Sequence, residues 1–109
     1  RTPSGLYLRD LAPGDGAPVG RGARVLVRYA GWLADGTPID SIRAADPPAA
    51  FRVGAREVIR AWDEGVVGMR AGGRRQLVVP PALGYGARWA GPVPPNAVLV
   101  FTLDVVGRP

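Results

Sequence analysis

The sequence lacks the two side chains that most often carry covalent chemistry, because it contains no histidine and no cysteine. Histidine is the commonest general base and metal ligand, and a cysteine thiolate is both a nucleophile and a metal ligand. Catalysis by this chain must therefore work without these groups. The residues that draw attention are instead aromatic: Trp62 in an apolar stretch and Tyr85 in a loop between two glycines.

Trp62 lies in the best helix candidate of the sequence, residues 53–66. An apolar stripe at helical spacing comprises Val58, Ile59, Trp62 and Val66. Gly65 is a residue type that commonly ends helices. A helix this short is marginal in water, so packing must hold it. The indole of Trp62 is the obvious anchor, either as plain core or as the floor of a site.

The rest of the sequence predicts strands joined by turns. Alternation of apolar and polar residues indicates a half-buried strand at 6–11 and a long strand at 24–33. Asp35 and Gly36 predict a hairpin turn after the long strand. The chain then returns through residues 37–40, and further strands are expected at residues 51–53, 74–80 and 97–106. We therefore predict an α+β fold, about five antiparallel strands with one helix packed on the sheet.

Composition fits a single folded domain covering residues 1–109, with a flexible N-terminal tail at residues 1–5. Hydrophobic residues make up 47% of the chain and charged residues 21%. No apolar run approaches the roughly 20 residues of a membrane helix, and no signal-peptide pattern opens the chain. The compartment stays open between the cytoplasm and export to the cell envelope, since an export signal can be removed.

All fourteen basic residues are arginine, and the formal net charge is +5. A nucleic-acid surface would be favoured by clustered charge with aromatic residues between. Only Arg74 and Arg75 are adjacent, and the other arginines are spread along the chain. We therefore expect a solvated basic surface and no nucleic-acid partner, with nucleic-acid binding kept as a weaker hypothesis.

Three blocks of the sequence resemble FKBP-type peptidyl-prolyl cis-trans isomerases. Residues 27–41 match the family pattern V-x-Y-x-G-x-L-x-D-G-x-x-F-D-S, with one change. Residues 51–66 are similar to F-x-L-G-x-x-x-V-I-x-G-W-x-x-G, and residues 83–101 to Y-G followed by I-P-P-N-x-x-L-x-F. Order and spacing agree from Leu6 to Val106, which is far more specific than one short motif.

The resemblance implies a bent antiparallel sheet wrapped around one short helix, with an apolar pocket between them that takes a proline ring. It implies an enzyme that accelerates rotation about X-Pro bonds during protein folding, without covalent chemistry, metal or cofactor. That rotation crosses a barrier of about 18–20 kcal/mol. The expected partners are proline-containing polypeptides and, with reduced affinity, macrolide ligands. The protein is expected to be a monomer.

The resemblance also assigns roles by position. Trp62 becomes the pocket floor, Tyr85 a hydroxyl that donates to a ligand carbonyl, and Asp40 a carboxylate beside it. The backbone N–H of Ile59 is the other polar contact. The catalytic set implied is Tyr29, Asp40, Trp62, Tyr85 and Phe101. The substrate-binding set implied is Ile39, Phe51, Val58, Ile59, Trp89 and Val93. From the residues alone, Asp40 fits a turn cap after the hairpin equally well.

The sequence departs from the family pattern on one side of the expected pocket. Ile39 replaces the usual phenylalanine, and Ala49 and Ala50 stand where an aromatic residue is usual. The arginine that often faces the pocket aspartate aligns near Ala45, with Arg43 as a candidate replacement. These changes predict a wider, less aromatic pocket. They also sustain an alternative function, a module that grips proline segments without turnover.

Overall fold

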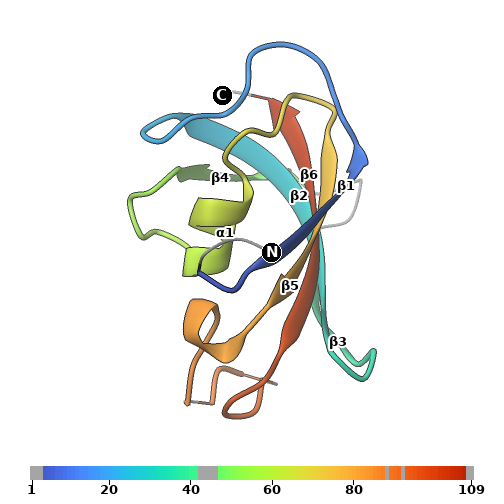
Figure 1. Ribbon diagram of the computed structural model, residues 1–109, viewed down its shortest axis with the longest axis vertical. Helices are drawn as coiled ribbons and strands as arrows, with labels where there is room; N and C mark the ends of the chain where they lie inside the picture. Colours follow the sequence, from blue (N-terminus) through green and yellow to red (C-terminus); the bar gives the residue numbers. More distant parts are fainter. Residues whose placement is uncertain (1–3, 42–46, 88, 92, 108–109) are drawn as a thin grey trace.

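A six-stranded antiparallel sheet curves around one short helix (Figure 1). The computed structural model describes residues 4–41, 47–87, 89–91 and 93–107, without the side chain of residue 40. The strands are β1 Tyr7–Ala12, β2 Arg24–Leu33, β3 Pro38–Ser41, β4 Ala49–Arg52, β5 Arg74–Val79 and β6 Leu99–Gly107. The helices are α1 Arg60–Gly65 and a single 3₁₀ turn, η1 Pro81–Leu83. The predicted α+β architecture is confirmed.

The strand order is β1-β5-β6-β2-β3, and β4 pairs with β2 beyond the point where β3 leaves it. Six strands are present rather than about five, because both β3 and β4 pair with β2. In Figure 1, α1 lies inside the curve of the sheet, on one face of β2, β5 and β6. No helix among the described residues is long and apolar enough to cross a membrane.

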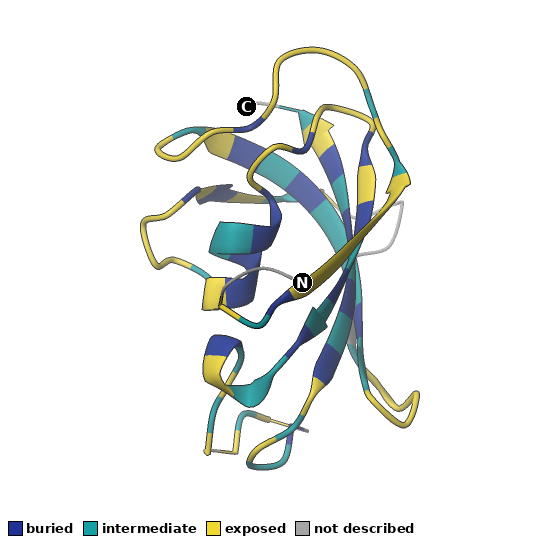
Figure 2. Cartoon of the chain, in the orientation of Figure 1, coloured by how far each residue is buried: buried dark blue, intermediate teal, exposed yellow. Residues whose placement is uncertain are grey.

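The core lies between α1 and the concave face of the sheet. Alternation along β2 is as expected, because Val25 and Val27 are fully buried while Leu26 is partly exposed. The prediction for β1 was wrong: Tyr7 is 49% exposed and the strand is not half-buried. It is an edge strand whose one neighbour among the described strands is β5, and Figure 2 shows it mostly exposed. Leu6, the residue immediately before β1, is fully buried in the core.

The hairpin between β2 and β3 forms at the predicted turn. Gly36 adopts a φ of 93°, a left-handed conformation that glycine tolerates best. The Thr37 N–H donates to Asp35 Oδ1 at 2.9 Å. Hydrogen bonds from the Thr37 side chain and backbone lower the pKa of the Asp35 carboxyl. This turn fixes the return of β3 along β2.

The sequence predicted a helix over residues 53–66, but α1 begins at Arg60, seven residues later. Gly54 and Arg56 have φ values of 83° and 61°, which no α-helix accommodates. The carboxylate of Asp63 accepts hydrogen bonds from the Gly54 N–H at 2.9 Å and the Arg56 N–H at 3.2 Å. A side chain inside the helix therefore stabilises the turn that precedes it. Val58 falls in that turn rather than on a helical stripe.

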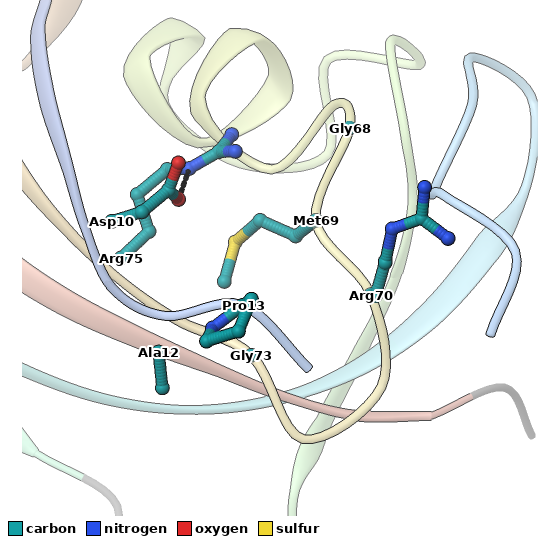
Figure 3. A pocket seen from close by; sticks show the side chains of 8 residues that line it. All are labelled: Asp10, Ala12, Pro13, Gly68, Met69, Arg70, Gly73 and Arg75. Atoms are coloured by element: carbon teal, nitrogen blue, oxygen red, sulfur yellow. Dashed lines mark hydrogen bonds and ion pairs between the residues drawn. The ribbon is translucent and has the colours of Figure 1, made fainter. Parts of the chain in front are cut away.

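Arg75 of β5 anchors the other end of α1 (Figure 3). Its Nη1 donates to the carbonyl oxygens of Gly65 at 2.8 Å and Val67 at 2.9 Å. Its Nε donates to Asp10 Oδ1 of β1 at 2.7 Å. The last carbonyls of a helix have no partner within the helix, so a buried guanidinium satisfies them. One arginine thus joins the helix end to two strands.

We predict that Arg75→Met lowers the free energy of unfolding by about 2 kcal/mol. Methionine keeps most of the buried volume but leaves the Gly65 carbonyl without its donor, and unpaired buried polar groups cost about 1–3 kcal/mol. Urea unfolding measures the change. Arg74→Met is the matched control: its ion pair with Asp104 is short, at 2.6 Å, but the Arg74 side chain is 55% exposed. An equal loss in both variants would contradict the anchoring role.

Candidate active site

Trp62 is the centre of an aromatic cluster drawn from α1 and three strands. It is 7% exposed. Its ring centroid lies 4.6 Å from that of Tyr29, 5.4 Å from that of Phe101 and 6.1 Å from that of Phe51. The contacts with Tyr29 and Phe101 are edge-to-face, a favoured geometry for aromatic pairs. These neighbours hold the indole in one orientation.

An open hollow of about 270 Å³ lies over this cluster, and we call it the apolar hollow. Its lining residues are Tyr29, Ala49, Val58, Ile59, Trp62 and Tyr85. The volume falls below the range of about 300–1,000 Å³ for pockets that enclose drug-sized ligands. A single small apolar group, such as the ring of a proline, suits a hollow of this size and lining.

The structure brings five of the predicted site residues to the lining of this hollow: Tyr29, Val58, Ile59, Trp62 and Tyr85. Two more, Phe51 and Phe101, are buried, and their rings pack near the indole of Trp62. Val93 is 4% exposed within the core, and Ile39 packs against the core from β3. Trp89 is 70% exposed and does not line the hollow.

Some expectations fall outside what the structure describes. The backbone of Asp40 pairs with Gly31 in the sheet, but its side chain is not among the described atoms. The suggestion that Arg43 replaces an arginine aligned near Ala45 concerns residues 42–46, which are also outside the described ranges. The same holds for residues 1–3 of the expected flexible tail.

Polar groups stand at the rim of the apolar hollow. Tyr85 is 40% exposed, and its loop is fixed by hydrogen bonds from the Gly86 N–H to the Pro81 carbonyl and from the Asn96 N–H to the Gly86 carbonyl, both at 2.8 Å. The N–H of Ile59, immediately before α1, has no hydrogen-bond partner in the described part of the chain. A ligand carbonyl could accept from either donor.

The indole N–H of Trp62 is buried and likewise has no partner among the described residues. Buried polar atoms are nearly always hydrogen-bonded, so this atom is an exception in the protein interior. The only polar group of the floor is thus hidden, and what Trp62 offers to a ligand is an apolar aromatic surface.

Asp63 was not singled out from the sequence as a site residue, yet it shapes the hollow. Its carboxylate fixes the turn that carries Val58 and Ile59 into the lining. The sequence carried one signal for this role, because an aspartate in the first turn of a helix is well placed to interact with unpaired backbone N–H groups. Here the Asp63 carboxylate oxygens accept from N–H groups of the preceding turn, and not from those of the helix itself.

We predict that Asp63→Ala lowers catalytic efficiency about tenfold, chiefly by raising KM. Without two backbone hydrogen bonds the turn is free to leave its left-handed conformation at Arg56, and small displacements of positioning groups are costly. Kinetics with a proline peptide measure the effect. Glu64→Ala is the control, because among the described residues Glu64 makes only a surface ion pair with Arg60 and a hydrogen bond with Ser4. Equal kinetics for the two variants would refute this role.

Other hollows in the described part of the chain have a different character. One of about 450 Å³ is lined mainly by charged side chains, namely Arg21, Arg56, Arg60, Asp63 and Glu64, together with Gly54. Another of about 190 Å³ lies beside the Arg75 anchor and Met69 (Figure 3). Neither presents an aromatic floor. No group of three or more acidic residues in the described ranges could hold a metal ion.

Residues 16–106 match the family model of the FKBP-type peptidyl-prolyl cis-trans isomerases. Since this match covers most of the chain, the protein belongs to that family and is an enzyme of that class. The resemblance stated from the three sequence blocks is therefore confirmed, and so are the predicted fold and isomerase activity. The alternative of a module without turnover is not favoured.

Among individual relatives, an FK506-binding protein of Neisseria meningitidis serogroup B is 42% identical over 103 residues, covering 94% of each chain. FK506-binding protein 4 of Dictyostelium discoideum is 46% identical over 95% of this chain, which spans 28% of that longer protein. The crystal structure of AtFKBP13 superposes with a TM-score of 0.91 at 36% identity, covering 98% of this chain and 95% of that one. FkpA from Escherichia coli gives 0.88 at 33% identity, covering 99% of this chain and 50% of the other.

Proposed function

We propose that the enzyme isomerises X-Pro bonds of polypeptides by holding the proline ring in the apolar hollow above Trp62. The observation that supports this most directly is the coincidence of an aromatic floor with two rim donors, the Ile59 N–H and the Tyr85 hydroxyl. The ring of the substrate would rest on the indole. Tyr29 and Phe101 would confine it from the sides.

The chemistry requires no nucleophile. Rotation removes the resonance of the C–N bond, and the twisted imide carbonyl carries less charge than the planar one. An apolar hollow that strips water from the imide therefore destabilises the planar form relative to the twisted one. In this proposal the donors of Ile59 and Tyr85 orient the flanking carbonyls. Asp40 would act as a carboxylate beside the Tyr85 hydroxyl.

The remaining predicted contacts are assigned to the edges of the same hollow. Phe51 supports the indole from below, while Ile39 and Val93 would close the side near β6. Trp89, being exposed, would contact residues of the substrate beyond the proline. Ala49 lines the hollow where the family usually has an aromatic residue nearby, so we propose weaker macrolide binding than is typical of the family. We also propose that residues 1–109 act as one domain and as a monomer.

A refolding assay tests this function. The substrate is an unrelated protein whose slow refolding phase is limited by proline isomerisation, which takes tens to hundreds of seconds uncatalysed. Catalytic amounts of the enzyme should accelerate that phase. If they leave the slow phase unchanged while a proline peptide still binds, the module without turnover is the correct description of this chain.

We predict that Tyr85→Phe lowers catalytic efficiency moderately, about fivefold, with no loss of stability. The change removes one hydroxyl that orients the substrate, and one hydrogen bond contributes about 0.5–1.5 kcal/mol. The refolding assay and thermal unfolding measure the two quantities. Tyr7→Phe removes a hydroxyl from exposed β1 and serves as the control. Full activity in Tyr85→Phe would remove Tyr85 from the proposed site.

A further inference from the structure

The face of the sheet opposite α1 carries an uninterrupted row of apolar side chains. The strand register places Tyr7 of β1 beside Val78 of β5, Val78 beside Val100 of β6, and Val100 beside Trp32 of β2. Their chain neighbours Leu77 and Phe101 point into the core, so these four point away from it. We call Tyr7, Val78, Val100 and Trp32 the outer apolar row.

The outer apolar row is accessible to solvent. Tyr7 is 49% exposed, and the other three are partly exposed. The only α-helix in the described part of the chain lies on the opposite face (Figure 1). An antiparallel sheet with one solvated face normally alternates apolar residues inward with polar residues outward. A row across four strands that breaks this alternation is a candidate interaction surface.

A charged border occupies the next two rows on the same face. The next row across the sheet begins with Arg9, which pairs with Gln76. Beyond it lie Arg74 and Arg28, each paired in register with Asp104. The Arg74 Nε donates to Asp104 Oδ1 at 2.6 Å, a hydrogen bond that raises the pKa of the arginine. Three arginines and one aspartate leave this border positively charged.

The outer apolar row and the charged border meet in a shallow hollow of about 410 Å³. Its lining residues include Arg28, Trp32, Arg74, Thr102 and Asp104. An apolar side chain could rest against Trp32 there, while a carboxylate beside it would reach the guanidinium groups. Arginine favours carboxylates because its planar fork can donate two parallel hydrogen bonds.

We propose that this outer face binds an extended polypeptide segment in which acidic residues flank apolar ones. A second copy of the chain fits poorly, because it would bring the same arginines together on a protein of net charge +5. A nucleic acid also fits poorly, because two valines separate Tyr7 from Trp32 and no continuous stacking surface results. The surface lies on the opposite face of the sheet from the apolar hollow, although Tyr29 of β2 lines a hollow on each face.

The test is a binding titration followed by fluorescence anisotropy and by amide chemical shifts of the isotope-labelled protein. The probe is a labelled peptide of sequence Asp-Leu-Glu-Phe-Asp-Val-Glu, which lacks the proline that the isomerase site is proposed to hold. We expect saturable binding, weakened by salt, with shifts in β2, β5 and β6 around the outer apolar row. The charge-reversed peptide Lys-Leu-Lys-Phe-Lys-Val-Lys and an oligothymidylate should bind at least about tenfold more weakly.

Two variants locate the surface. Trp32→Thr should weaken binding about tenfold by removing the largest apolar contact. Arg9→Glu should weaken it similarly by reversing a border charge, and its exposed position keeps the fold intact. Val98→Thr, which alters an exposed valine outside the row, should bind like the unaltered protein. All three should retain isomerase activity.

Several outcomes would overturn the proposal. These are no binding of the acidic peptide, equal binding of the charge-reversed peptide, tighter binding of the oligothymidylate, and shifts confined to residues around Trp62. Unchanged affinity in both Trp32→Thr and Arg9→Glu would have the same force.

Discussion

Replacing Trp62 by alanine should abolish measurable isomerisation and lower the free energy of unfolding by about 3–5 kcal/mol. The loss of activity follows from the proposed role of the indole as the surface on which the proline ring rests. The loss of stability follows from a cavity among Tyr29, Phe51 and Phe101, whose rings all pack against it. Trp62 combines three aromatic contacts in the core with a place in the lining of the apolar hollow, so one substitution affects both.

The two effects of Trp62→Ala can be separated by a matched variant. Val66→Ala also opens a cavity beneath α1, since Val66 is fully buried, but Val66 does not line the apolar hollow. It should lose about 2–3 kcal/mol of stability and keep its activity below the unfolding transition. Activity assays and urea unfolding on both proteins decide the matter. If Val66→Ala is as inactive as Trp62→Ala, the loss of activity in Trp62→Ala is caused by lower stability and not by removal of the indole from the hollow.

Replacing Gly31 by valine should be the second most damaging change, with a stability loss of about 3 kcal/mol from overpacking. Gly31 lies near the C-terminal end of β2, where a Cβ atom would stand 2.5 Å from Cε1 of Phe101 and 3.3 Å from Cγ1 of Ile39. The ring of Phe101, which packs edge-to-face with Trp62, must then move. Activity should fall at least about tenfold, because a displaced side wall narrows the space proposed for the proline.

Gly20→Val is the control for Gly31→Val. Gly20 has an ordinary φ, and a Cβ there would meet no atom within 4 Å. The control should lose less than about 1 kcal/mol, as surface substitutions generally do. Thermal unfolding and peptide kinetics compare the two. Equal stability of both variants would show that the close approach of Phe101 to Gly31 is not maintained in solution.

Much of the fold could be predicted from the sequence because local signals and burial agree there. The alternation of β2 matches its buried face, and Asp35 with Gly36 forms the hairpin that the residue types indicate. The end of α1 at Gly65 was also predicted, and the chain then turns through Gly68, whose left-handed φ of 88° is typical of a glycine after a helix. In each case neighbouring residues along the chain decide the structure.

Other features depend on contacts between distant residues and could not be predicted in the same way. The start of α1 is set by the Asp63 carboxylate reaching back to Gly54, nine residues earlier. The exposure of β1 follows from its edge position, which alternation does not encode. The aromatic residues of the hollow were indicated by motif, whereas the distance of Trp89 from it depends on the course of a long loop.

The buried indole of Trp62 also gives the enzyme a built-in optical signal. The protein has three tryptophans: Trp62 buried with its N–H unpaired among the described residues, Trp32 partly exposed, and Trp89 70% exposed. An indole shielded from water emits at shorter wavelength than one in contact with solvent, so Trp62 should dominate the blue edge of the emission spectrum. A peptide that covers its accessible surface would shift or quench that edge alone. Peptide binding at the site can then be followed in the unlabelled protein from the short-wavelength fluorescence of Trp62.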